Sequence, residues 1–325
     1  MRVVSMRHFK PIAAIAMTFV SIQILAIAFM YYALSSDDQA FQNPSDPMIA
    51  IYYMVMLLGF TGLFLVLIKY GFGKALKGIF YVSIGFVVFF VASALLALPF
   101  NVNYPPSASD TAMVFIDSVL IAALSVIAIW KSPEWYIIDC VGVVMSVGMI
   151  ALLGLSLSIV PILILLIALA IYDFISVYKT KHMLTLAEGV SDMGLPLLLV
   201  VPKKLPYSYI ESKPKLTKTA EESEDKPERE AFLVGLGDII IPGLLSASAF
   251  WFIDDGGQIF ILGIPSYLMV ALGTIAGSLI GLILLMKIVM KGNPQAGLPL
   301  LNTGALLGFF ITYLLVFGLN FSYIH

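Results

Sequence analysis

Four aspartates lie inside long apolar stretches of the sequence: Asp117, Asp139, Asp173 and Asp238. A charged side chain in the hydrocarbon core of a bilayer costs on the order of 2.5–3.5 kcal/mol even on a lenient scale, so each acid is a candidate functional residue. Each could also be a structural hydrogen-bonding residue or part of an ion pathway. Their depth in the membrane and the neighbouring residues are needed to distinguish functional aspartates from structural ones.

Asp173 and Asp238 lie at similar depths. Asp173 comes shortly before Lys179 on one stretch, and Asp238 comes shortly after Glu230 on the next. With a helical rise of about 1.5 Å per residue, the two acids lie roughly 9 Å and 12 Å inside the same membrane edge. If the two stretches are neighbouring antiparallel helices, their carboxyl groups can meet.

Paired carboxyl groups have a definite chemistry. Two of them within a few ångströms cannot both be ionised, so one keeps a proton near neutral pH. Such a pair is suited to peptide hydrolysis, because the ionised acid takes a proton from water and the protonated acid donates to the developing oxyanion. Which aspartate takes which role stays open, since the pair titrates as a unit.

The flanking residues also distinguish this pair. In the stretch 235–238 two glycines precede the acid, and each costs a helix about 1 kcal/mol relative to alanine. They allow a substrate or a neighbouring backbone to approach closely, or they serve helix packing. Asp139 shares the cytoplasmic half with the pair, while Asp117 lies nearer the outer face; for both, we favour a structural role.

The elements that must position these acids are membrane-spanning helices. Apolar residues make up 60% of the 325 residues and charged residues only 12%, which is typical of an integral membrane protein. We predict an all-α, polytopic fold with nine transmembrane helices, at about 11–34, 48–68, 75–99, 111–130, 135–155, 159–178, 231–253, 262–286 and 296–320. In the eighth, Gly273, Gly277 and Gly281 share one face and predict close helix packing.

The basic residues predict the orientation. All 18 Lys and Arg residues fall on one side of this nine-helix arrangement, and the opposite connections contain none. The positive-inside rule therefore places the N-terminus in the cytoplasm and the C-terminus outside. In a prokaryote the membrane would be the plasma (cell) membrane.

One long polar segment divides the chain. We predict an N-terminal part of six helices at 1–178, a cytoplasmic loop at 179–230 and a C-terminal part of three helices at 231–325. Within the loop, 193–202 is apolar but too short to cross, so we expect an interfacial or re-entrant piece. The stretch 211–230 is dense in Lys, Glu, Pro and Ser and is predicted to be mobile.

Several other chemistries lack their residues. Cys140 is the only cysteine, the three histidines lie far apart at segment ends, and neither an HExxH pair nor a GxSxG elbow occurs. We expect no metal and no organic cofactor. We also expect no nucleic-acid partner, although the near-neutral net charge alone does not decide this.

Taken together, these residues resemble the presenilin and signal peptide peptidase family of intramembrane GxGD aspartyl proteases. The resemblance consists of Tyr172-Asp173, of Gly235-Leu236-Gly237-Asp238 and of a proline-leucine motif that opens the ninth helix. It implies a presenilin-like fold over nearly the whole chain, with Asp173 and Asp238 as the catalytic pair. Tyr172, Gly235, Leu236 and Gly237 are then active-site motif residues.

The same resemblance implies a substrate-binding motif. The family's Pro-Ala-Leu motif corresponds to Pro299, Leu300 and Leu301, with leucine in place of the middle alanine. An alternative register uses Ala296-Gly297-Leu298. The predicted orientation is similar to that of presenilin, whereas signal peptide peptidases are inserted the opposite way.

The function that we predict is cleavage of peptide bonds within transmembrane helices of other proteins, in the lipid bilayer. The chain could also act as a homo-oligomer. The main alternative is a secondary transporter or ion channel that uses its membrane aspartates to carry ions. A prepilin-type peptidase and a non-catalytic helix-binding scaffold are further alternatives.

Overall fold

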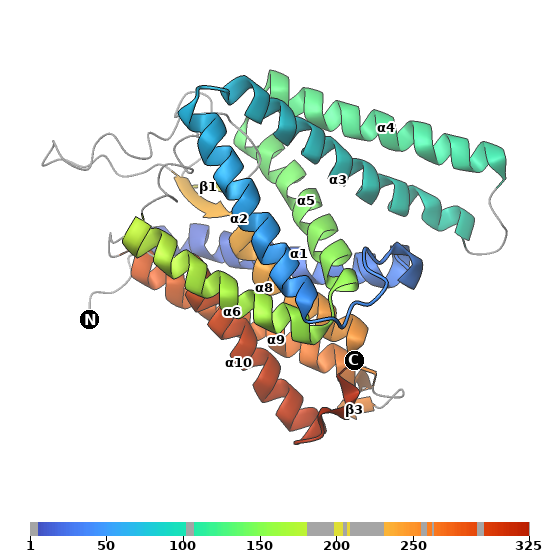
Figure 1. The fold of residues 1–325 in the computed structure, drawn as a ribbon, viewed down its shortest axis with the longest axis vertical. Coiled ribbons are helices and arrows are strands. Elements are labelled where there is room, and N and C mark those ends of the chain that lie inside the picture. Colours follow the sequence, from blue (N-terminus) through green and yellow to red (C-terminus); the bar gives the residue numbers. More distant parts are fainter. Residues whose placement is uncertain are drawn as a thin grey trace, which may run out of the picture. The chain divides into compact units, whose positions relative to one another are not determined.

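The computed structural model describes residues 6–101, 107–180, 198–203, 207–208, 231–254, 259–261, 263–290 and 296–324. The described chain is mostly helical (Figure 1). Its helices are α1 (Met6–Ala33), α2 (Met48–Lys69), α3 (Gly73–Asn101), α4 (Ala108–Lys131), α5 (Trp135–Ser156), α6 (Ile159–Ile175), α8 (Leu236–Phe252), α9 (Ser266–Val289) and α10 (Gly297–Phe317). Two short strand pairs accompany them: β1 (Leu198–Pro202) with β2 (Ala231–Gly235), and β3 (Ile259–Ile261) with β4 (Ile264–Pro265).

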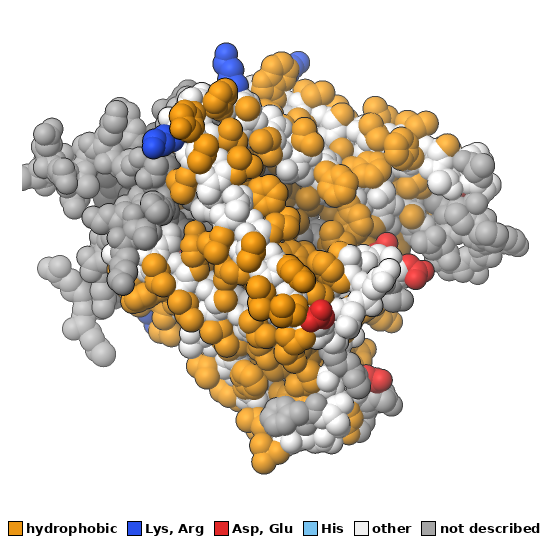
Figure 2. Space-filling model, viewed as in Figure 1, with side chains coloured by type: hydrophobic (Ala, Val, Ile, Leu, Met, Phe, Trp, Pro, Cys, Tyr) orange, Lys and Arg blue, Asp and Glu red, His pale blue; other side chains and the backbone are white. Residues whose placement is uncertain are grey.

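Length and composition suit these helices to a membrane. Within the described residues, 8 helices are long and apolar enough to cross a bilayer, and α8, with 17 residues, is a shorter apolar helix. Figure 2 shows hydrophobic side chains over most of the described surface on the side in view. Such wide apolar exposure is typical of a surface covered by lipid. The chain is a multi-pass integral membrane protein, and its N-terminal orientation stays a prediction.

The segment predicted as the seventh span differs from a single helix. Residues 231–235 form strand β2, which pairs antiparallel with β1 from Leu198↔Gly235 to Pro202↔Ala231. Aromatic and β-branched residues such as Phe232 and Val234 favour a strand, and α8 begins only at Leu236. Strand β1 falls in the apolar stretch 193–202, of which 193–197 lie outside the described residues, as does the predicted mobile stretch 211–230.

The chain forms two compact units, each built from separate stretches of sequence. The first comprises Met1–Ile15, Thr61–Met145 and Lys181–Leu236. In it, α3 and α4 run side by side (Figure 1), and an apolar cluster that includes Ile84, Val88 and Ala122 joins them. The predicted division at 178 and 230 follows chain order and stays a prediction.

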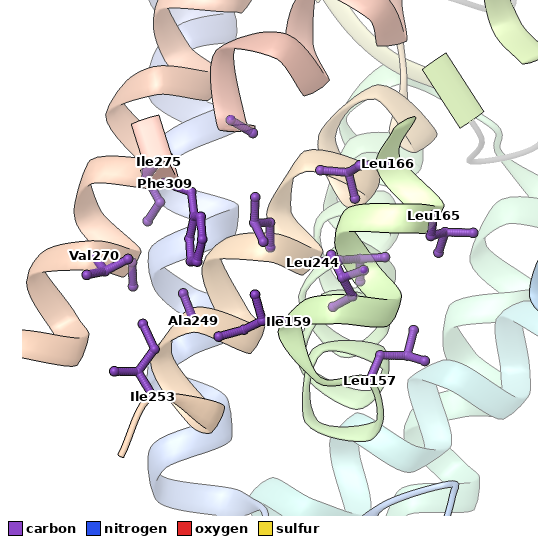
Figure 3. Close-up of a cluster of buried hydrophobic side chains, with 14 of the residues drawn as sticks. Leu157, Ile159, Leu165, Leu166, Leu244, Ala249, Ile253, Val270, Ile275 and Phe309 are labelled. Carbon is purple, nitrogen blue, oxygen red and sulfur yellow. The ribbon is translucent and has the colours of Figure 1, made fainter. Parts of the chain in front are cut away.

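The second unit comprises Ala16–Phe60, Ser146–Thr180 and Gly237–His325. Its core brings together apolar side chains from distant stretches, among them Ile159, Leu166, Leu244, Ile275 and Phe309 (Figure 3). Helix α10 packs against both α9 and α6 (Figure 1). The core therefore joins the helices that carry Asp173, Asp238 and the start of α10.

Glycines bring α9 and α10 into backbone contact. A Cβ atom at Gly277 would collide with the carbonyl oxygen of Gly304 and lie 2.7 Å from the Cα of Gly308, and one at Gly281 would lie 2.6 Å from the carbonyl oxygen of Leu300. At Gly273 it would collide with Thr312. The close packing predicted from the glycine spacing is confirmed, and it fixes how near α10 lies to α9.

A buried polar group ties α1 to the same unit. The Gln23 amide nitrogen donates to the Ser278 hydroxyl at 3.4 Å, and the Ser246 hydroxyl donates to the Gln23 amide oxygen at 3.2 Å. All three residues have no exposed surface. Directional bonds between α1, α8 and α9 supplement apolar packing that has no directional preference of its own.

Candidate active site

Asp173 lies in the last turn of α6, directly before a change of helix type. Helix α6 ends at Ile175, and a π-helical turn follows at Ser176–Thr180. Asp173 is only 2% exposed. Tyr172 beside it is half-buried, and its hydroxyl makes no hydrogen bond among the described residues. Single π-helical turns are frequent at functional sites.

Asp238 lies in the first turn of α8, at a change from strand to helix. Gly235 is the last residue of β2, and Leu236, which is buried, is the first of α8. The two glycines therefore do not interrupt a helix but flank its beginning. Gly237 is exposed, and a Cβ there would meet no atom within 4 Å. A peptide backbone could approach the chain closely at this position.

The start of α10 joins the two acids. The backbone N–H of Leu298 donates to Oδ2 of Asp173 at 3.1 Å, and the backbone amide of Gly297 acts on the same carboxylate. A Cβ at Gly297 would lie 3.0 Å from Oδ2 of Asp238. Both carboxyl groups thus border one dipeptide, Gly297-Leu298, and lie within range of each other's charge.

Covalent geometry limits the separation of the two acids. Oδ2 of Asp173 lies 3.1 Å from the Leu298 nitrogen, and Oδ2 of Asp238 lies 3.0 Å from the point where a Cβ on Gly297 would be. Because that point and the Leu298 nitrogen are only three bonds apart, the two carboxyl oxygens lie within about 10 Å of each other. The two carboxyl groups come from antiparallel helices, as predicted.

The start of α10 supplies the electrostatics of the site. The first N–H groups of a helix have no partner within the helix, and the helix dipole places partial positive charge there. Two of these groups face Asp173, so they stabilise negative charge on it. Among the described residues, the other oxygen of Asp173, Oδ1, is buried and has no hydrogen-bond partner.

The remaining predicted motif residues lie just beyond this dipeptide. Pro299 is half-buried, and its carbonyl accepts a hydrogen bond from the Thr303 hydroxyl at 2.6 Å. Leu300 packs its backbone on Gly281, and Leu301 has no exposed surface. The residues next to the acids are those of the alternative register, Gly297 and Leu298.

Asp139 and Asp117 belong to the first unit, whereas Asp173, Asp238 and Gly297-Leu298 belong to the second. Oδ1 of Asp139, on α5, accepts the backbone N–H of Val200 in β1 at 2.8 Å, within the first unit. Asp117 is exposed on α4. One buried polar residue near the site was not predicted from the sequence: Asn302, one turn after Leu298, whose Nδ2 donates to the carbonyl of Leu166. The sequence feature that could have revealed it is a single amide side chain in an otherwise apolar span.

The fold and the site define a class: a polytopic membrane protein that brings two acids from neighbouring helices to the start of a third. The sequence profile of the family described as "Signal-peptide peptidase, presenilin aspartyl protease" matches residues 16–318. No curated protein sequence matches the chain significantly.

Solved structures agree with the family profile. The chain is similar to a presenilin family intramembrane aspartate protease solved in space groups C222 and P2, with 30% sequence identity and a TM-score of 0.63 in each case. The matches cover 94% and 95% of this chain and 99% of the other chain. The chain belongs to the signal peptide peptidase and presenilin family, and it is an intramembrane aspartyl protease whose substrates are membrane-spanning proteins.

Proposed function

We propose that Asp173 and Asp238 are the catalytic pair and that they hydrolyse peptide bonds within transmembrane helices by activating one water molecule. The observation that carries this proposal is the meeting of both carboxyl groups at Gly297-Leu298. The partner-free Oδ1 of Asp173 supports it, because a base needs an oxygen available to accept a proton.

The helix terminus supports different roles for the two acids. The N–H groups of Gly297 and Leu298 stabilise negative charge on Asp173, whereas, among the described residues, no backbone N–H of α10 donates to Asp238. Asp173 is therefore the base and takes a proton from water as the water oxygen bonds to the scissile carbon. Asp238 is the acid and donates its proton to the carbonyl oxygen.

The second half of the reaction returns the protons. The tetrahedral intermediate collapses when its hydroxyl gives its proton back to Asp238, the carbonyl re-forms, and the C–N bond breaks. The proton that Asp173 took from water goes to the leaving amine. Both acids end in their starting states, so no further reactant besides water is needed. Cleavage should pass through a maximum with pH, because one acid must be ionised and the other protonated.

Motif residues around the acids have supporting roles in this proposal. The open space at Gly237 admits the substrate backbone next to Asp238, and Gly235 and Leu236 set the strand-to-helix turn. Tyr172 borders Asp173. Pro299 and Leu300, which are partly exposed, contact the substrate, while the buried Leu301 acts through packing on α9.

The test is incubation of purified protein with a generic transmembrane peptide, followed by mass measurement of the products. Wild-type protein should release two fragments, and the sum of their masses should exceed the mass of the intact peptide by one water molecule. Asp173→Ala and Asp238→Ala should release these fragments at least about 10³-fold more slowly. A protein that leaves every peptide uncut, yet moves ions into liposomes, would support the transporter alternative instead.

A further inference from the structure

Asn302 is a buried amide in an otherwise apolar stretch of α10. It has no exposed surface, and its Nδ2 donates to the backbone carbonyl of Leu166 on α6 at 2.8 Å. Among the described residues, its Oδ1 has no hydrogen-bond partner. Asn302 therefore joins α10 to α6 by one directional bond and leaves one acceptor unsatisfied.

This arrangement is unfavourable for stability alone. The Leu166 carbonyl lies within α6, where helical bonding already uses one of its lone pairs. An unsatisfied buried amide oxygen carries a desolvation cost that an apolar side chain at this position would not have. What the amide adds is direction, which apolar packing in a bilayer does not supply.

The positions of the bonded residues along α10 and α6 show what the directional bond of Asn302 fixes. Leu298 and Asn302 lie one turn apart on α10, and Leu166 and Asp173 lie two turns apart on α6, so each pair shares a helix face. Leu298 bonds Asp173 and Asn302 bonds Leu166. Two bonds at separate heights fix both the sliding and the rotation of α10 against α6. The glycine contacts with α9 fix only how close the backbones lie.

We propose that Asn302 is a positioning residue, which holds the start of α10 so that the amides of Gly297 and Leu298 reach Asp173. This inference rests on the proposed function, because it concerns the charge that Asp173 carries during cleavage. Without the bond to Leu166, α10 can slide or turn by a fraction of an ångström, and the support of the base weakens. A shift of this size disturbs proton transfer more than it disturbs the apolar contacts of Pro299 and Leu300 with the substrate, so the loss falls on kcat more than on KM.

Asn302→Leu tests the proposal, with Ser248→Ala as the matched control. Ser248 is equally buried and also donates to a carbonyl of another segment, that of Leu157, at 3.0 Å, but it lies far along α8 from Asp238. We expect Asn302→Leu to lower kcat about 10- to 100-fold with KM within about twofold, since small misplacements of a catalytic group have effects of this size. Ser248→Ala should keep kcat within about twofold.

Rates are normalised to monodisperse, folded protein, and the thermal midpoint of each variant is measured. Asn302→Ala, which adds no bulk, is measured as well and should show the same loss of kcat. A wild-type kcat in either folded Asn302 variant overturns the proposal, and so does a loss that Ser248→Ala shares. If wild-type protein cuts no peptide, the proposed function fails; if it cuts and only the Asn302 variants behave as wild type, this inference alone fails.

Discussion

Asp173 and Asp139 are both carboxylates inside predicted spans, and each accepts a backbone N–H hydrogen bond from a distant segment, at 3.1 Å from Leu298 and 2.8 Å from Val200 respectively. They differ in the groups that surround each carboxylate. Asp173 shares Gly297-Leu298 with a second acid and keeps one oxygen without a partner, whereas Asp139 bonds a strand of the first unit. An acid in a membrane helix thus becomes a candidate catalyst through a second acid from another helix and not through burial alone.

The largest effect should come from removing either member of the pair. Asp173→Ala and Asp238→Ala should each lower the rate of peptide cleavage about 10³-fold or more, because neither acid can supply both proton transfers. Product masses with a transmembrane peptide give the rate. The folded state should survive, since removing one acid relieves repulsion, and size-exclusion elution checks it. If Asp139→Asn is as inactive as Asp238→Ala, the pairing of Asp173 with Asp238 is wrong or incomplete.

A side chain at Gly297 should have the next largest effect. Gly297→Val places its Cβ about 3.0 Å from the Asp238 carboxylate, so either that carboxylate or the start of α10 must shift. We expect a 10- to 100-fold lower cleavage rate, by analogy with other displaced catalytic groups. Gly78→Val on α3 is the control, because a Cβ there meets nothing within 4 Å. Equal activity of the two variants would refute the close approach of Gly297 to Asp238.

Replacing Asp139 should affect stability more than chemistry. Asp139→Leu leaves the N–H of Val200 without its acceptor, and we expect the free energy of unfolding to fall by about 1–3 kcal/mol. Asp139→Asn keeps an acceptor oxygen, so its stability and its cleavage rate should stay close to wild type. Thermal unfolding in detergent and the peptide assay measure the two quantities. A rate that collapses in Asp139→Asn without loss of stability would give Asp139 a chemical role.

The smallest effect should come from Asp117. Its side chain is exposed on α4 and is not among the groups that meet at Gly297-Leu298. Asp117→Asn should keep the cleavage rate within about twofold of wild type. A dependence of activity on Asp117, measured in the same peptide assay, would point to a partner or a second copy of the chain at α4.

Much of the arrangement follows from residue type. Acids in apolar runs are conspicuous, and the four-residue spacing of Gly273, Gly277 and Gly281 predicts the tight packing against α10 that the structure has. The start of α8 is harder to predict from the sequence, because an apolar stretch with β-branched residues is compatible with either a strand or a buried helix. Pairing with β1, which is far away in sequence, decides for the strand at 231–235.

Gly297 and Leu298 illustrate what residue type does not reveal. They carry no polar side chain, and their backbone amides are the groups that face Asp173. Asn302 is conspicuous as an amide, but its partner is a backbone carbonyl 136 residues away. No pattern in the sequence predicts that contact.

The sequence by itself determined a membrane-spanning chain with two acids at matching depth, because the cost of placing charge and unpaired backbone in lipid depends on residue type and spacing. The tertiary structure alone decided which backbone amides meet those acids. Every residue except proline carries the same N–H group, so only the packing of α10 against α6 and α9 selects the two that support Asp173.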